Sequence, residues 1–185
     1  HLQNVQPDMT VFDKLPGVKK KAYYYALGSL AGHKNFKWVR EVAARNPDKT
    51  FVVAGGKDLV AFGSAEADAA KNTSNIFYPG YVTDGQNKAL MQNCKGFLHP
   101  AVFEGFGIPP LEALSLGAPI ALARASCLPE LYGDTARYFD PYDYDVDLDA
   151  LFAKPVTPPD KVLAKYSWEK TARFWLDEIK KCAEA

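Results

Sequence analysis

The sequence predicts an α/β fold in three layers, with a parallel β-sheet covered by helices on both faces. Short apolar runs bounded by glycine or proline alternate about five times with segments whose apolar residues recur at helical spacing. Strands separated by helices form parallel sheets that are buried on both faces, so such strands are apolar throughout. The 185 residues, 48% of them hydrophobic, suffice for one domain with its own core.

The first half of the chain predicts a polar leader, three strands and one helix. Residues 1–10 are polar and aperiodic, and we interpret residues 1–21 as a leader or interdomain segment ahead of a domain over 22–165. Residues 57–72 are polar and small, which predicts a loop with at most a short helix. A helix is predicted where Phe36, Val39, Val42 and Ala43 recur at helical spacing, up to Asn46-Pro47. The predicted strands are 22–27, 50–56 and 75–82, the last broken by Pro79-Gly80.

The second half continues the alternation. Thr83-Asp84 is an N-cap signal that opens a helix up to Cys94. Another helix begins with two prolines after Gly107 and ends at Gly117, which is the usual placing of proline and glycine around a helix. The remaining predictions are strands over 95–101, 118–123 and 136–141, a helical turn over 128–134, at most a short helix within 141–160, and a closing amphipathic helix over 166–185, capped by Ser167.

Composition excludes several classes of protein. The 22 basic and 22 acidic residues balance, and no basic block is present, so we expect no nucleic-acid partner. The three cysteines, Cys94, Cys127 and Cys182, are scattered without a CxxC pair, which predicts reduced thiols in a cytoplasmic compartment. An acidic stretch over 140–149 lacks the glycine and closing glutamate of a calcium loop, so we interpret it as a solvated surface and expect no metal.

The stretch FEGFGIPPLEAL, residues 103–114, carries the strongest chemical signal. Gly105 and Gly107 flank Phe106 just before a predicted helix, whose free N–H groups can hold an anion. Glu112 lies early in that helix, where a carboxylate also suits the helix dipole. Glu104 precedes the turn, where a carboxylate is most often simply solvated. His99 and His33 are interpreted as a hydrogen-bonding loop residue and an exposed loop residue.

This stretch resembles the glutamate–seven-residue–glutamate motif of the retaining glycosyltransferase group 1 family, which has the GT-B fold of two Rossmann-like domains. Other stretches resemble the same family in the same order, over about residues 22–180: LGSLAGHKNF, FVVAGG, IFYPGYVTD, GAPIALARASCLPEL, ARYFDPYD and YSWEKTARFWL. The resemblance implies a Rossmann-like, C-terminal, nucleotide-sugar-binding domain, which is one half of a GT-B protein. In such proteins the closing helix often packs on the other domain, so part of its apolar surface is expected to be uncovered here.

The resemblance also implies roles for single residues. Glu104 would contact the donor sugar and Lys34 would neutralise the diphosphate, which makes these two the expected catalytic residues. Glu112 would accept hydrogen bonds from the ribose hydroxyls. Gly105, Phe106 and Gly107 would hold the diphosphate or sugar hydroxyls, and Tyr81 and Val82 would lie at the base. Many relatives carry arginine where Ser29 stands, and some carry another at His33. Lys34 must then carry more of the charge, or His33, Lys57 or Arg124 contributes.

The implied activity is transfer of a hexose from a UDP- or GDP-linked donor to a glycan or lipid-linked acceptor, in cell-surface polysaccharide synthesis. The acceptor would bind to a missing N-terminal domain, so the fragment alone is expected to be inactive. No cofactor or metal is expected, and the full protein would act in the cytoplasm or peripherally at the inner membrane face. The alternative is a degenerate or regulatory Rossmann-like module without transfer activity, to which Ser29 gives weight.

Overall fold

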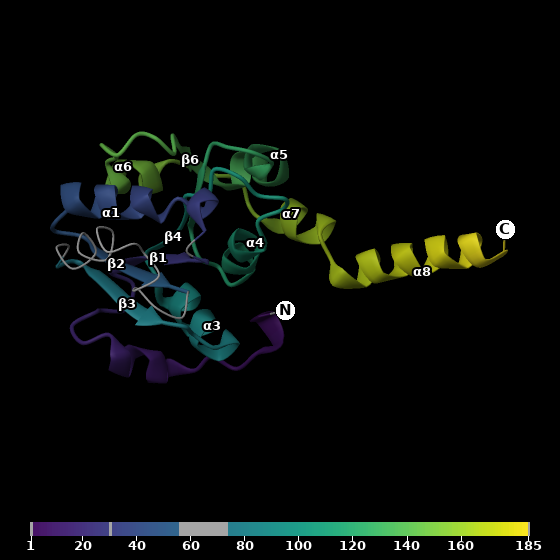
Figure 1. The fold of residues 1–185 in the computed structure, drawn as a ribbon, viewed down its shortest axis with the longest axis horizontal. Helices are drawn as coiled ribbons and strands as arrows, with labels where there is room; N and C mark the ends of the chain where they lie inside the picture. Colours follow the sequence, from purple (N-terminus) through teal and green to yellow (C-terminus); the bar gives the residue numbers. More distant parts are fainter. Residues whose placement is uncertain (1, 30, 56–73, 185) are drawn as a thin grey trace.

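The computed structural model describes residues 2–29, 31–55 and 74–184, and it confirms the three-layer α/β architecture (Figure 1). Within these residues one parallel sheet has the order β3-β2-β1-β4-β5-β6. Figure 1 shows α1 and α6 over one face, and α3 with the N-terminal segment over the other. The strands are β1 Tyr23–Leu27, β2 Thr50–Ala54, β3 Ile76–Gly80, β4 Gly96–His99, β5 Ile120–Ala123 and β6 Arg137–Phe139.

The helices match the sequence-based predictions except in one place. They are α1 Phe36–Arg45, α3 Asp84–Asn93, α4 Ile108–Ser115, α5 Leu128–Tyr132, α6 Leu148–Ala153, α7 Asp160–Lys165 and α8 Trp168–Glu184. Short 3-10 turns are η1 Leu2–Asn4, η2 Met9–Lys14, η3 Gly32–Lys34 and η5 Gly133–Thr135. Helix α7 was not predicted, and the predicted loop over 57–72 lies outside the described residues.

Local signals account for the helix boundaries. The side chain of Thr83 accepts a hydrogen bond from the backbone of Gln86, and the side chain of Gln86 accepts one from the backbone of Thr83. This reciprocal capping box satisfies two free donors at the start of α3, as the Thr83-Asp84 signal predicts. Pro79 lies inside β3 rather than breaking it. Because β3 is an edge strand of the described sheet, the missing N–H of proline is tolerated there.

The core lies on both faces of the sheet. Tyr23, Tyr24 and Tyr25 are buried in succession along β1, because a central parallel strand has no solvent face. Their hydroxyls still find partners: Tyr23 donates to the carbonyl of Leu90 at 2.8 Å and Tyr25 to Asn87 Oδ1 at 2.9 Å. Burying a hydroxyl without such a bond would be costly.

The N-terminal segment packs onto the domain instead of leading away from it. Leu2, Val11 and Leu15 are buried in the common core. The ammonium group of Lys88 on α3 donates to two carbonyls of this segment, at 3.0 and 2.8 Å. Gly85 allows the close approach, since a Cβ there would lie 2.8 Å from the carbonyl oxygen of Gln6. Val11 and Leu15 alone are spaced as on a helix and Leu2 lies outside that spacing, so the sequence shows no extended apolar period here.

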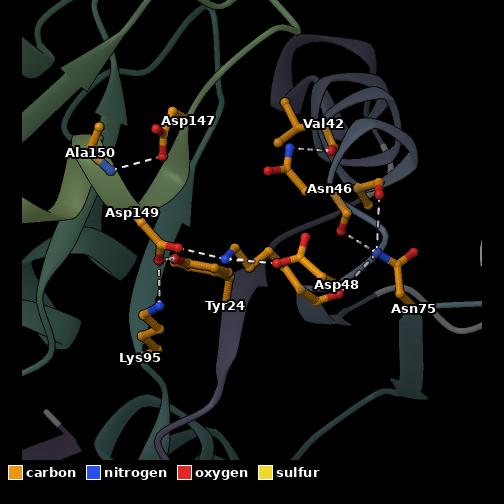
Figure 2. Close-up of polar contacts among 11 residues, drawn as sticks. Tyr24, Val42, Asn46, Asp48, Asn75, Lys95, Asp147, Asp149 and Ala150 are labelled. Carbon is orange, nitrogen blue, oxygen red and sulfur yellow. Dashed lines mark hydrogen bonds and ion pairs between the residues drawn. The ribbon is translucent and has the colours of Figure 1, made fainter.

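The amino-terminal edge of the sheet carries a polar network (Figure 2). The carboxylate of Asp149 pairs with Lys95 at 2.6 Å and with Lys49 at 2.5 Å, and these two lysines immediately precede β4 and β2. Asn75 donates to three carbonyls at the end of α1 and in the turn that follows it (Figure 2). The acidic stretch over 140–149 therefore serves local structure, with Asp147 capping α6 and Asp149 bridging two strands.

Helix α8 extends away from the body of the domain (Figure 1). None of its residues is buried, and its large apolar side chains are more than half exposed: Trp168, Phe174, Trp175, Leu176 and Ile179. Ser167 Oγ accepts from the backbone N–H of Lys170 at 3.5 Å, which agrees with the predicted N-cap. The exposed apolar face agrees with the expectation that part of this surface is uncovered.

The strand order identifies where a ligand would bind. From β1 the chain moves outward to β2 and β3, then returns to place β4 on the other side of β1. The loops after β1 and β4 therefore diverge, and in open parallel sheets ligands bind in the crevice outside such a switch point. These two loops contain Lys34 and Glu104.

Candidate functional site

Three charged or polar side chains meet at this switch point. The Nζ of Lys34, in η3 after β1, donates to Oε1 of Glu104 at 2.6 Å. The Nε2 of His99, the last residue of β4, lies 2.9 Å from the same oxygen. Lys34 and Glu104 are 70 residues apart in sequence, so the adjacency of β1 and β4 alone brings them together. Both predicted catalytic residues thus belong to one cluster, together with His99.

The surroundings of Glu104 keep its carboxylate ionised. The pKa of Glu104 is lowered from an ordinary 4.5 to about 2, most strongly by the hydrogen bond from His99. Burial is the second-largest effect and opposes it, and the hydrogen bond from Lys34 lowers the pKa further. Only 11% of the Glu104 side chain and 20% of the Lys34 side chain are exposed. Such a carboxylate can accept hydrogen bonds at neutral pH but cannot donate a proton, so it suits ligand contact rather than general acid catalysis.

The loop that carries Glu104 is held by residues after β5. The hydroxyl of Ser126 and the thiol of Cys127 donate to the Glu104 carbonyl at 2.9 and 3.2 Å. The hydroxyl of Tyr132 donates to the Gly107 carbonyl at 2.6 Å. The loop is therefore fixed before any ligand arrives, and a preorganised group loses less entropy on binding than a mobile one.

Gly107 begins helix α4 in a conformation that favours glycine. Its φ of 81° lies in the left-handed region, and a Cβ there would come within 2.9 Å of Leu128 Cδ2. The side chain of Phe106 packs edge-on against the ring of Tyr166, with ring centroids 4.9 Å apart. Residues 109 and 110 of the eight-residue helix α4 are prolines and have no N–H, so the backbone donors that remain at its start are those of Gly107 and Ile108, next to the Glu104 loop.

Glu112 lies in a different environment from Glu104. It is the fifth residue of α4 and therefore beyond the first turn, so the interpretation as a dipole-stabilising carboxylate is wrong. Burial raises the pKa of Glu112. Glu112 and Phe106 line a cavity of about 860 Å³, bounded by Gln3 and Asn4 on one side and by residues 163 and 165–171 on the other. A half-buried carboxylate in a cavity suits a ligand with hydroxyl donors.

The other predicted site residues lie around the same edge. Ser29 and His33 are exposed in the loop after β1, and His33 contributes its carbonyl to a hydrogen bond from the Val102 backbone at 2.9 Å. Tyr81 is 69% exposed and Val82 is buried, directly after β3, two strands away from β1. Gly105 is exposed, with open space around its Cα.

Two further cations were considered as helpers for Lys34. Arg124 follows β5, and its guanidinium lies over the ring of Tyr138 at 4.9 Å. It also lines a second cavity of about 580 Å³ beside β6, away from the Glu104 cluster. Lys57 lies outside the described residues. Among the cations that the structure describes, the geometry therefore brings only Lys34 to Glu104.

Sequence reasoning undervalued His99. It was interpreted as a hydrogen-bonding loop residue, but it is the last residue of β4, is only 2% exposed and contacts Glu104. Its position at the end of an apolar strand, five residues before a motif glutamate, was the available signal. Tyr166 was also missed, although its ring packs on Phe106.

The described part of the chain offers neither a metal-binding cluster nor a membrane-spanning helix. Over residues 2–29, 31–55 and 74–184, no group of three or more His, Cys, Asp or Glu side chains could hold a metal ion. No helix in these same ranges is long and apolar enough to cross a membrane.

Comparison with known proteins gives close relatives over part of the chain. The chain is 34% identical over 116 residues to the serotype-specific mannosyltransferase WbdA of Escherichia coli. The aligned region covers 56% of this chain and 14% of that protein. It is 41% identical over 70 residues to O-antigen chain mannosyltransferase B of Escherichia coli, covering 38% of this chain and 18% of that protein. The chain thus spans less than a fifth of the length of these relatives.

Solved structures agree on the fold. Sucrose-phosphate synthase from Thermosynechococcus elongatus superposes with a TM-score of 0.78 over 100% of this chain and 51% of that one, at 16% identity. The family model that describes glycosyl transferases group 1 matches residues 9–150, which is most of the chain and includes Lys34, Glu104 and Glu112. The chain therefore belongs to the glycosyl transferases group 1 family.

Proposed function

We propose that this chain is the donor-binding, C-terminal domain of a retaining glycosyltransferase that transfers a hexose from a nucleoside diphosphate to a glycan or lipid-linked acceptor. The single observation that carries the proposal is the meeting of Lys34 and Glu104 at 2.6 Å at the switch point, beside the start of α4. A cation, a set of free N–H groups and a carboxylate then surround one space, where a diphosphate and a sugar can lie together.

The mechanism follows from where charge develops. Transfer breaks the bond between the anomeric carbon and the diphosphate, so negative charge grows on the leaving oxygen while the sugar becomes oxocarbenium-like. Lys34 and the N–H groups at the start of α4 would stabilise that leaving group, and removing one such preorganised donor commonly costs a few kcal/mol of the barrier. Glu104 would accept hydrogen bonds from sugar hydroxyls, and Glu112, on the far side of the turn, from the ribose hydroxyls.

The identity of the sugar and of the pathway rests on the relatives. Both Escherichia coli relatives are named as mannosyltransferases, and one as an O-antigen chain enzyme. Mannose is thus the first hexose to test, with GDP and UDP as the alternative carriers. We infer a role in cell-surface polysaccharide synthesis, in the cytoplasm or at the inner membrane face, with the acceptor bound by a domain outside this chain. No cofactor or metal is required by this scheme.

A second candidate is a degenerate module that keeps the fold without productive donor binding. Ser29 stands exposed where many relatives carry arginine, and the charge of Lys34 is already balanced by Glu104. Both observations would weaken the attraction for a diphosphate.

Calorimetry separates these candidates. The 185-residue chain should bind GDP or UDP, and their sugar conjugates, and Glu112→Ala should weaken binding of the nucleotide by about tenfold, as expected for loss of hydrogen bonds to a charged group. Glu184→Ala, on the exposed end of α8 and outside the cavity that Glu112 lines, is the matched control and should bind as the wild type does. Absence of binding by every nucleotide would favour the degenerate module. Sugar transfer by this chain alone, at ordinary enzyme rates, would contradict the placement of the acceptor on another domain.

A further inference from the structure

One oxygen atom of Glu104 receives two hydrogen-bond donors from different parts of the sheet. Oε1 lies 2.6 Å from Lys34 Nζ and 2.9 Å from His99 Nε2. Across the described part of the chain, the other oxygen, Oε2, has no protein partner. The carboxylate is thus occupied on one side and keeps full acceptor capacity on the other.

The contact with the carboxylate of Glu104 indicates which atom of His99 carries the bonding hydrogen. The low pKa of Glu104 means that its carboxylate is ionised at neutral pH and can only accept. The hydrogen on the bond must therefore belong to Nε2 of His99. A neutral imidazole with its proton on Nε2 is sufficient for this bond, and no positive charge on the ring is required.

The two donors differ in how firmly they are held. His99 ends the central strand β4, is 2% exposed, and its ring stacks on Phe97 with centroids 6.4 Å apart. Lys34 is 20% exposed and belongs to a short 3-10 turn, and its long side chain can change rotamer at little cost. A diphosphate in the crevice would compete with Glu104 for the ammonium of Lys34, whereas it cannot reach the buried imidazole.

We propose that His99 is a positioning residue that holds Glu104 through Oε1, so that the carboxylate keeps its place, with Oε2 open to a sugar hydroxyl, when Lys34 turns to the diphosphate of the donor. This inference rests on the proposed function. It assigns His99 to the sugar part of the ligand and leaves binding of the nucleoside diphosphate to other groups. Without His99, the carboxylate of Glu104 would move with Lys34 or adopt several rotamers, and the sugar hydroxyl would lose a hydrogen-bond acceptor at a fixed position.

The test compares the affinity for a nucleotide with that for its sugar conjugate. Calorimetry on the 185-residue chain would use GDP against GDP-mannose, and UDP against UDP-glucose. The dissociation constant of the nucleoside diphosphate divided by that of its sugar conjugate isolates the contribution of the sugar, and a larger ratio means a more favourable contribution. His99→Phe, which keeps a ring but removes the donor, should lower this ratio by about tenfold while the nucleoside diphosphate binds as before. His99→Gln, whose amide N–H₂ can replace Nε2–H, should restore the ratio to within about threefold.

A structural control keeps the result interpretable. Leu98→Ala perturbs the same strand from the opposite face of the sheet, so it should lower the melting temperature and leave the ratio unchanged. An unchanged ratio in His99→Phe, or an equal loss in His99→Gln, would overturn the inference while nucleotide binding still supports the proposed function. Failure of the wild type to bind any of the four ligands would overturn both. Independently of ligands, nitrogen NMR of the imidazole should find the proton on Nε2, and a proton on Nδ1 alone would also refute the proposal.

Discussion

Replacing Glu104 by Gln tests the electrostatics of the site without any ligand. The substitution keeps the shape and the acceptor oxygen but removes the negative charge. The pKa of Glu104 is lowered from an ordinary 4.5 to about 2, and each unit between the unfolded and folded values corresponds to about 1.36 kcal/mol. The charge thus stabilises the folded state by about 3 kcal/mol at neutral pH.

The sign of the pH dependence follows from the depressed pKa. The stabilisation is complete above the ordinary pKa of 4.5 and is lost as the pH falls toward about 2, because the unfolded state then binds the proton first. Glu104→Gln should therefore reduce the free energy of unfolding by about 3 kcal/mol at pH 7 and by roughly half as much at pH 3. The pKa of Asp149 is also lowered to about 2, by Lys49 and Lys95, but that contribution is present in both proteins and cancels in the difference.

Urea denaturation at pH 7 and pH 3 supplies the measurement. Trp38 is fully buried, whereas Trp168 and Trp175 are mostly exposed on α8, so the change in fluorescence on unfolding reports mainly on Trp38. Glu169→Gln, which breaks an exposed pair with Arg173, is the matched control and should change stability by less than about 0.5 kcal/mol at either pH. A Glu104→Gln variant as stable as the wild type at pH 7, or equally destabilised at both pH values, would refute the reasoning.

Three further predictions concern the framework of the site. Gly107→Ala should lower the free energy of unfolding by about 1–3 kcal/mol, because the left-handed φ of 81° and the 2.9 Å approach to Leu128 exclude a Cβ. Gly105 has open space around it, so Gly105→Ala should lower the free energy of unfolding by less than about 0.5 kcal/mol in the same denaturation assay. Thr83→Ala should lower the free energy of unfolding by about 1 kcal/mol, because it removes the side-chain cap of α3. Thr83→Ser keeps the capping hydroxyl and should lose much less stability, so equal losses in the two variants would argue against the capping box. Deletion of α8 should shift the melting temperature of the chain by no more than about 2 °C, because the helix buries none of its residues, and a large drop would show that it packs on the domain.

Agreement between sequence and structure is best where the signal is local. The cap of α3 spans three residues, and the glycine and prolines around the start of α4 lie within a single turn, so their geometry is readable from neighbouring letters. The positions of β1 and β2 along the chain were predicted correctly, because their short runs of apolar residues are typical of a buried strand. Residues 1–10 are polar and aperiodic in sequence, yet residues 2–15 bring Leu2, Val11 and Leu15 into the core. Contacts with α3, rather than an extended apolar period, hold this segment.

Agreement was poorer for the chemistry of the site. Glu112 looked like a first-turn carboxylate, yet the helix begins at Ile108, which places Glu112 in the second turn and in the wall of a cavity. His99 looked like a loop residue, yet it ends β4 and contacts Glu104. The start of α4 was predicted correctly, so the error for Glu112 lay in placing it within the first turn. The predicted strand over 95–101 already contained His99, and what the sequence could not supply was its contact with Glu104.

The sequence alone determined the alternation of strands and helices, the turn of glycines and prolines that begins α4, and the resemblance that pointed to its chemistry, because caps, glycine conformations and apolar periods depend on a few adjacent residues. The tertiary structure alone decided that Lys34 and His99 both contact the same carboxylate oxygen of Glu104. The contact of Lys34 with Glu104 joins residues 70 positions apart and exists because β4 pairs with β1. Strand order depends on the burial of the entire sheet, and no short stretch of sequence encodes it.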